Sequence, residues 1–266
     1  HELEEMFTRA ILPDLRARLV AEGTEGVIAS RVLRTWGSSE SGLAEALDGY
    51  LSGLEGTATT IAFLASGIEG LKVRLTVRAP DDATALARLD EEERAVRDVL
   101  FDALGDVVFG VDDVAMEHAV AQRLVARGLT LGVAESLTGG LVASRLVNVA
   151  GASAWFRGAV VSYAADVKRD LLAVGEGSVV TRAAAAEMAV GARRVLRSDV
   201  GLSLTGVAGP DEEDGVAVGT VFVGLALGDV QPVVTELRLP GDRARVREYA
   251  TISALDALRR SLDALG

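Results

Sequence analysis

Lys168 and Ser136 are the side chains of this sequence whose types best suit covalent chemistry. Only two of the 27 basic residues, Lys72 and Lys168, are lysine, and the others are arginine. Arginine stays protonated in proteins, whereas a desolvated lysine can lose its proton and serve as a base. Lys168 is therefore a candidate to activate a serine hydroxyl. The alternative is that Lys168 has no special role and lies by chance on a solvated face.

Ser136 lies where an apolar run gives way to hydroxyl and glycine residues. We expect a buried strand over 129–134 and a helix over 139–148 on either side of it. Unpaired backbone N–H groups at such a helix start attract phosphates or developing oxyanions. The two glycines at the start of the helix would let a ligand approach closely. The alternative is that Ser136 or Thr138 only caps the helix.

Lys168 lies in a similar arrangement further along the chain, in which a strand is followed by a short loop and the start of a helix. It lies in the expected first turn of a helix over 166–174, after a strand over 158–163. The helix macrodipole disfavours a cation there, which suits an amine that is neutral part of the time. If the two strands are parallel, their carboxyl ends share one sheet edge, so that Ser136 and Lys168 meet. Glu135 is either a partner of this site or a core carboxylate bonded to the backbone.

Two further turns place polar groups at the ends of expected strands. The segment from Thr205 to Pro210, with Gly206 and Gly209, offers a flexible backbone cradle for a ligand. The turn Pro240-Gly241-Asp242-Arg243 precedes the last helix, and its arginine could hold a phosphate through two hydrogen bonds. Such turns are common, so their convergence at one sheet edge is the informative feature.

Residues 114–266 alternate between apolar strands and amphipathic helices, which is typical of an α/β domain. The expected strands cover 129–134, 158–163, 200–205, 219–227 and 232–239. The first expected helix begins near Met116, and the later ones cover 139–148, 166–174, 181–197 and 243–265. The last two strands are joined around Gly228-Asp229, which predicts a hairpin. We therefore expect a three-layer α/β/α domain with a mixed five-stranded sheet.

The part of the chain before this domain predicts a small α+β domain over residues 25–113. Its expected strands cover 27–33, 59–65, 71–79 and 107–109, and its expected helices cover 39–51 and 81–104. Further upstream, apolar residues at helical spacing predict a helix over 3–21. We therefore divide the chain into three parts, 1–24, 25–113 and 114–266.

The composition indicates a globular protein. The chain has 266 residues, of which 49% are hydrophobic and 25% are charged, enough for one large or two ordinary domains. Cysteine is absent, which excludes disulfides, thiolate metal sites and a cysteine nucleophile. We find no apolar run near the ~18 residues that a membrane helix needs. The first five residues include three glutamates and none of the basic residues of a signal peptide, so we expect a cytoplasmic location.

The net charge of −12 is unevenly distributed. Residues 1–113 carry 22 acidic and 11 basic side chains, whereas residues 114–266 are close to neutral. An acidic first half repels phosphate backbones, so we expect no nucleic-acid partner. Gly67-Ile68-Glu69-Gly70 fits a nucleic-acid-clamping pattern, but its place between two expected strands favours a hairpin turn. The balanced second half could hold an anionic small molecule.

Several stretches of the sequence together resemble the competence/damage-inducible protein CinA family. They are Ala134–Gly140, Gly151–Phe156, Tyr163 with Lys168, Thr205–Pro210, Val218–Val221 and Gly241–Arg243. The resemblance is dense over residues 114–266. Residues 25–113 resemble the family's KH-like middle domain, and the helix within 1–24 resembles the tail of its N-terminal molybdopterin-binding-like domain.

The resemblance implies that the last domain is a nicotinamide mononucleotide deamidase, an amidohydrolase that forms nicotinic acid mononucleotide and ammonia. It implies that Ser136 is the nucleophile or its activating hydroxyl, and that Lys168 is the general base. Thr138 and Tyr163 would support the reacting groups, and Arg243 would hold the phosphate or ribose. The other candidates for substrate binding belong to the same turns: Gly139, Gly140, Thr205, Gly206 and Gly209.

The resemblance also sets expectations for cofactors and partners. The family's pyrophosphatase activity and its metal belong to the N-terminal domain, so we expect no cofactor and no metal here. Family members are commonly dimers, so we expect a homodimer. The implied ligand is a small molecule, a pyridine mononucleotide, and we expect no membrane partner.

The sequence departs from the family pattern at three places. Leu137 stands where the family usually has cysteine, Ala164-Ala165 where it has Ser-Asn, and the acidic residues 211–214 where it has a Gly-rich loop. Loss of the asparagine removes a polar substrate contact, and acids beside a phosphate are unfavourable. The alternative function is therefore a catalytically weak or inactive protein that binds a nucleotide or a partner.

Overall fold

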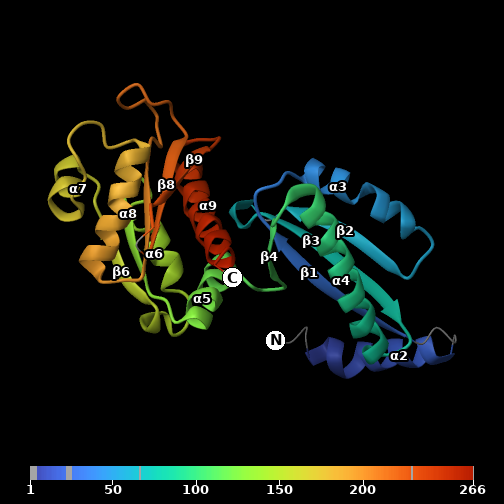
Figure 1. The fold of residues 1–266 in the computed structure, drawn as a ribbon. Helices are drawn as coiled ribbons and strands as arrows, with labels where there is room; N and C mark the ends of the chain where they lie inside the picture. Colours follow the sequence, from blue (N-terminus) through green and yellow to red (C-terminus); the bar gives the residue numbers. More distant parts are fainter. Residues whose placement is uncertain (1–4, 22–25, 66, 229, 266) are drawn as a thin grey trace. The chain divides into compact units, whose positions relative to one another are not determined.

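The computed structural model describes residues 5–21, 26–65, 67–228 and 230–265, and its ribbon is drawn in Figure 1. The chain divides into two compact units. The first comprises His1–Leu33, Ser38–Ala65 and Lys72–Asp112, and the second comprises Arg34–Gly37, Ser66–Leu71 and Asp113–Gly266. The expected helix over 3–21, the part over 1–24 and the turn at Gly228-Asp229 lie partly outside the described residues.

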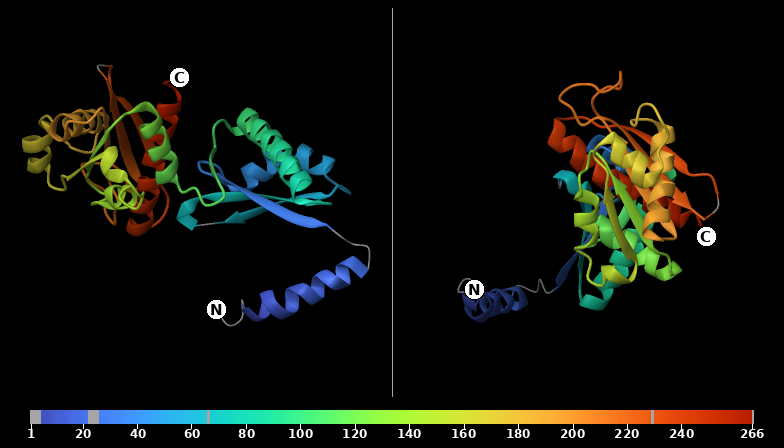
Figure 2. Two further views of the ribbon diagram at one scale, coloured as in Figure 1. Left: turned by 90° about the horizontal axis from the view of Figure 1, so that it is seen from below. Right: turned by 90° about the vertical axis from the view of Figure 1, so that its left-hand side faces the viewer.

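The first unit is built on a four-stranded sheet with strand order β2-β3-β1-β4. Its strands are β1 (Val27–Thr35), β2 (Thr59–Ala65), β3 (Leu71–Ala79) and β4 (Val108–Val111). Helices α3 (Glu40–Gly53) and α4 (Asp82–Leu104) pack against each other on one face of this sheet (Figure 2). Before the sheet come a π-helical turn, η1 (Phe7–Ile11), and α2 (Leu12–Ala21). The predicted α+β architecture is confirmed.

A mixed five-stranded sheet forms the centre of the second unit, in the order β6-β5-β7-β8-β9. Its strands are β5 (Leu131–Glu135), β6 (Phe156–Val161), β7 (Val200–Gly206), β8 (Thr220–Leu227) and β9 (Val233–Arg238). β5 pairs in parallel with β6 and β7, whereas β8 pairs antiparallel with β7 and β9. These pairings confirm the predicted mixed sheet and the pairing of its last two strands.

Helices cover both faces of this sheet (Figures 1 and 2). On one face α8 (Arg182–Leu196) packs against all five strands, and α7 (Ala165–Leu172) packs against α8. On the other face α9 (Arg243–Asp263) contacts β7, β8, α5 (Met116–Arg127) and α6 (Leu141–Leu146). The three predicted layers are therefore confirmed.

The close approach of α8 to the sheet depends on glycine in the strands. A Cβ atom at Gly201 of β7 would lie 2.0 Å from the Ala189 carbonyl oxygen, and one at Gly224 of β8 would lie 2.3 Å from the Ala185 carbonyl oxygen. Neither distance is tolerable for a side chain, so the absence of a Cβ lets the helix backbone lie directly on the strands.

Strand direction brings the polar turns together. β5, β6, β7 and β9 all run the same way, because β8 is antiparallel to both β7 and β9. Their carboxyl ends share one edge of the sheet, the usual location of ligand sites in α/β folds. Ser136 directly follows β5 and Gly206 ends β7, while Lys168 and Arg243 lie in the first turns of α7 and α9, the helices that follow β6 and β9.

The loop after β5 is longer than predicted. The expected helix over 139–148 is only Leu141–Leu146, because Gly139 and Gly140 have positive φ angles of 60° and 99°. Glycine adopts such angles without strain, but they cannot belong to a right-handed helix. Ser136 therefore lies in a five-residue loop, 136–140, between strand and helix.

Candidate functional site

A cavity of about 130 Å³ lies at the carboxyl edge of the five-stranded sheet. Four separate loops contribute to its wall. The residues of the predicted site that line it are Ser136, Tyr163, Lys168, Gly206, Gly209 and Arg243. Folding thus gathers around one small space a hydroxyl, an amine, a guanidinium and two glycine backbones.

Lys168 is a buried amine in the first part of α7. Only 2% of the residue is exposed, and its Nζ donates a hydrogen bond to the Tyr163 carbonyl oxygen at 2.9 Å. Burial lowers the pKa of Lys168 because desolvation penalises the ammonium form, and the Glu213 carboxylate opposes this effect. The lowered pKa increases the fraction of neutral amine at a given pH, which is the form that can accept a proton.

Ser136 lies directly after β5 and is 8% exposed. Its backbone N–H donates to the Leu204 carbonyl of β7 at 3.0 Å, so the sheet holds the backbone of the residue in place. None of the described residues forms a hydrogen bond with its hydroxyl, and the residue lines the cavity. A small ligand in the cavity would therefore meet a fixed backbone and an unengaged hydroxyl.

Arg243 and Tyr163 connect two further loops at the cavity. The Arg243 guanidinium donates to the Gly209 carbonyl at 2.6 Å and to the Tyr163 hydroxyl at 2.8 Å. Because the Tyr163 carbonyl also accepts from Lys168, Tyr163 connects the amine to the guanidinium. The remaining N–H groups of Arg243 could meet an anionic group of a ligand.

Glu135 determines what the start of α6 can bind. Its carboxylate accepts hydrogen bonds from the backbone N–H groups of Gly140, Val142 and Ala143 at 2.9, 3.1 and 2.9 Å. The expectation that unpaired N–H groups here attract a phosphate is therefore wrong, because the chain supplies its own anion. The suggestion that Ser136 or Thr138 caps this helix is also wrong, since the N-cap residue is Gly140, which has no side chain to form a cap hydrogen bond.

Replacing Glu135 by alanine is expected to lower the free energy of unfolding by about 2–4 kcal/mol, because one buried and two partly buried backbone N–H groups lose their acceptor. Glu135→Gln keeps one acceptor oxygen and should lose less. Urea unfolding of both variants measures the difference. A Glu135→Ala value within about 0.5 kcal/mol of the wild type would contradict this role.

Four of the predicted site residues do not line the cavity. Thr138 is fully buried, and its Oγ1 has no hydrogen-bond partner among the described residues. The Thr205 hydroxyl donates to the Val179 carbonyl at 2.7 Å, and this hydrogen bond links β7 to the segment before α8. Gly139 and Gly140 shape the loop through their backbone angles. Their assignment to substrate contact stays a prediction.

Two residues of the acidic run 211–214 line the cavity, although they were not among the predicted substrate-binding residues. Asp211 and Glu213 come from the loop before β8, which ends at the same sheet edge. The backbones of Glu213 and Val216 pair through two hydrogen bonds, of 3.2 and 2.8 Å, which give this loop a defined turn. The acidic run in the sequence was the available signal, and only the fold shows that it reaches Lys168.

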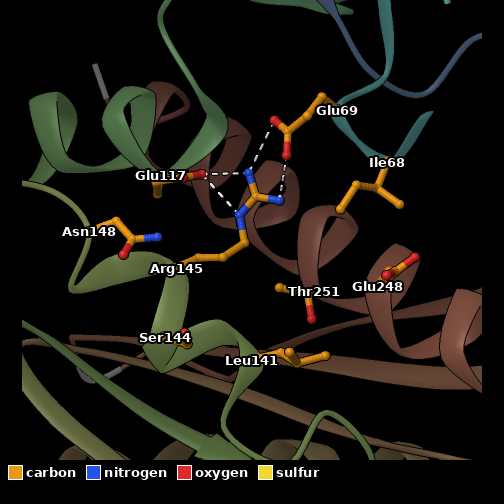
Figure 3. Close-up of a pocket in the computed structure, with 9 residues that line it drawn as sticks. All are labelled: Ile68, Glu69, Glu117, Leu141, Ser144, Arg145, Asn148, Glu248 and Thr251. Carbon is orange, nitrogen blue, oxygen red and sulfur yellow. Dashed lines mark hydrogen bonds and ion pairs between the residues drawn. The ribbon is translucent and has the colours of Figure 1, made fainter. Parts of the chain in front are cut away.

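A second cavity, of about 280 Å³, lies beside α6 and α9 within the second unit (Figure 3). Arg145 of α6 projects into it and is held by Glu117 at 2.6 Å and by Glu69 at 3.0 Å. Glu69 belongs to η2 (Gly67–Glu69), the turn between the neighbouring strands β2 and β3, as the predicted hairpin requires. Because the guanidinium is already paired with two carboxylates, this cavity offers no ready anion site.

In the part of the chain that the structure describes, no group of three or more His, Asp or Glu side chains is arranged to hold a metal ion. None of the described helices is both long and apolar enough to cross a membrane.

Residues 113–262, more than half of the chain, match the family described as the CinA C-terminal domain. The chain belongs to the CinA family. Residues 30–110 of this CinA-family chain match a second family, described as the KH domain of damage-inducible protein CinA.

Curated CinA-like proteins resemble the chain over nearly all of its length. The protein from Frankia casuarinae is 46% identical over 99% of this chain and 60% of the relative. The protein from Gloeobacter violaceus is 40% identical over 98% of this chain and 60% of the relative. The chain thus spans about 60% of the length of these relatives.

Solved structures of the CinA superfamily share the fold. A crystal structure of the superfamily protein from Klebsiella pneumoniae is 32% identical, with a TM-score of 0.54 over 56% of this chain and 96% of that chain. The competence/damage inducible protein CihA from Agrobacterium tumefaciens is 31% identical, with a TM-score of 0.51 over 56% of this chain and 97% of that chain.

Proposed function

We propose that the second unit hydrolyses the carboxamide of nicotinamide mononucleotide to nicotinic acid mononucleotide and ammonia. The observation that carries the proposal is that Ser136 and the buried Lys168, 32 positions apart in the chain, line one cavity. A serine hydroxyl and an amine with a lowered pKa in the same cavity suit amide hydrolysis by nucleophilic attack. The two groups share the cavity without a hydrogen bond to each other, since the amine donates to the Tyr163 carbonyl. Membership of the CinA family supports the same reaction.

The proposed reaction has two stages. The neutral Lys168 amine accepts the Ser136 proton while the serine oxygen attacks the carboxamide carbon. The tetrahedral intermediate then breaks its C–N bond, and the Lys168 ammonium returns the proton to the departing ammonia. Water next attacks the serine ester, again with proton transfer through Lys168, and releases the carboxylic acid. The hydrogen bond from Lys168 to the Tyr163 carbonyl orients the amine throughout.

The charges that line the cavity suit a dipolar substrate. Arg243 would face the phosphate, while the carboxylates of Asp211 and Glu213 would face the positively charged pyridinium ring. The two carboxylates would thus attract the pyridinium ring of this substrate, even though they repel its phosphate.

The alternative is that the unit binds a nucleotide or a partner without turnover. Its support is the Ala164-Ala165 pair, where the resemblance leads us to expect Ser-Asn, and the acidic residues at 211–214. Tight nucleotide binding without ammonia release would favour this alternative.

The test is an assay of the purified chain with nicotinamide mononucleotide. We expect ammonia and nicotinic acid mononucleotide to form in equal amounts, measured by a coupled ammonia assay and by chromatography. Nicotinamide riboside and free nicotinamide serve as matched substrates without the phosphate or the ribose phosphate. No ammonia above the protein-free background from any of the three would refute the proposal.

Arg243→Ala is expected to lower kcat/KM for the mononucleotide by about 30-fold, because a charge-assisted contact to the phosphate is lost. The riboside, which has no phosphate, should lose much less. Steady-state kinetics on both substrates measure this difference. The matched control is Arg245→Ala on the same helix, because Arg245 is exposed and its guanidinium stacks over Tyr249 at 5.7 Å. An equal loss for both substrates would assign Arg243 a purely structural role.

A further inference from the structure

The backbone of the Ser136 loop is held by a side chain that does not line the cavity. Arg247 of α9 donates from Nε to the Leu137 carbonyl and from a terminal nitrogen to the Thr138 carbonyl, both at 2.9 Å. Leu137 follows the proposed nucleophile directly. One guanidinium therefore spans two consecutive peptide units next to Ser136.

The helix that carries Arg247 is anchored in the core. Arg247 lies on α9 between Val246 and Ala250, which are both fully buried. The Arg247 backbone carbonyl accepts a hydrogen bond from Thr251 Oγ1 at 2.8 Å. The side chain thus extends from a rigid helix to a loop 110 positions earlier in the chain.

Arg243 and Arg247 lie one helical turn apart and project from the same side of α9. Arg243 bonds to the Tyr163 hydroxyl and to the Gly209 carbonyl, while Arg247 bonds to the loop of Ser136. The first two turns of α9 therefore hold together the loops that follow β5, β6 and β7.

The chemistry of the contact favours arginine over lysine. The planar guanidinium carries several N–H donors in a fixed fork, so two bonds fix both the position and the orientation of the loop. An ammonium group has three donors without a fixed plane on a flexible stem, so it would hold the two carbonyls less rigidly. Displacement of a nucleophile by about 1 Å can reduce turnover by about 100-fold.

We propose that Arg247 is a positioning residue that holds Ser136 in place for attack, without touching the substrate. This inference rests on the proposed function for its kinetic test and on the reactivity of Ser136 for a test independent of the substrate. Arg247 acts through the Leu137 and Thr138 carbonyls, and α9 is the rigid element that connects it to Arg243.

The test compares Arg247→Ala, Arg247→Lys and the control Arg245→Ala in the full chain. We expect Arg247→Ala to lower kcat about 100-fold with less than about a twofold change in KM. The acid limb of its pH profile should not move, because Lys168 is untouched. Arg247→Lys should recover part of the lost kcat, and added guanidinium ion should raise kcat of the alanine variant. If the alanine variant does not fold, the lysine variant carries the test.

A second measurement separates this inference from the proposed function. The rate at which a fluorophosphonate labels Ser136, followed by mass spectrometry, should fall in the Arg247 variants and not in Arg245→Ala. A wild type that labels but releases no ammonia would refute the proposed function and still test the positioning. Wild-type values of kcat and labelling rate in the folded Arg247 variants would overturn the inference, as would a change in KM alone. A wild type that neither labels nor releases ammonia would overturn both.

Discussion

Lys168→Arg is expected to reduce ammonia release by about 1,000-fold while leaving the fold intact. The substitution keeps a positive charge but removes an amine whose pKa is lowered by burial and which can lose its proton, and general-base catalysis contributes about 100- to 10,000-fold. Steady-state ammonia release at several pH values measures the effect. The matched control is Lys72→Arg, since Lys72 is the other lysine of the chain and lies on β3 of the first unit.

The pH dependence follows from the burial of Lys168. Activity should rise as the pH increases through the pKa of the amine, because only the neutral form accepts the serine proton. Burial moves this pKa below its ordinary value, and the Glu213 carboxylate raises it. Glu213→Gln should therefore move the acid limb of the profile to lower pH. An unchanged profile in Glu213→Gln, or full activity in Lys168→Arg, would argue against Lys168 as the base.

Ser136→Ala is expected to abolish turnover, with a loss of about 1,000-fold or more, while nucleotide binding persists. The reason is that the alanine side chain lacks the attacking oxygen, whereas the contacts of Arg243 and of the acidic loop remain. Ammonia release and calorimetric binding of the mononucleotide measure the two properties separately. Ser153→Ala, which alters an exposed serine in the same unit, serves as the matched control.

Loss of turnover with retained binding would assign Ser136 a chemical role. Unchanged ammonia release in Ser136→Ala would remove the serine from the mechanism altogether. If the wild type binds the nucleotide as tightly as the variant and neither releases ammonia, the alternative of a non-catalytic binding protein is favoured instead.

Sequence periodicity predicted most of the fold because the hydrophobic pattern matched the local structure. The buried strands β5 and β7 are short apolar runs, and the apolar residues of α9 recur at helical spacing. The exceptions were set by backbone angles, as at Gly139 and Gly140, where the positive φ angles shorten α6. Composition does not reveal whether a glycine lies inside a helix or before its start.

The sequence by itself determined which groups could do chemistry: Lys168, one of only two lysines among 27 basic residues, a serine at a strand end and polar turns at four strand ends. Tertiary structure alone decided how they act. In the folded chain the Glu135 carboxylate accepts hydrogen bonds from the N–H groups at the start of α6, and the Glu213 carboxylate raises the pKa of Lys168. Arg247 donates to the backbone carbonyls beside Ser136. The physical reason is that hydrogen bonds and desolvation depend on distances of a few ångströms between residues up to 110 positions apart, which no local pattern encodes.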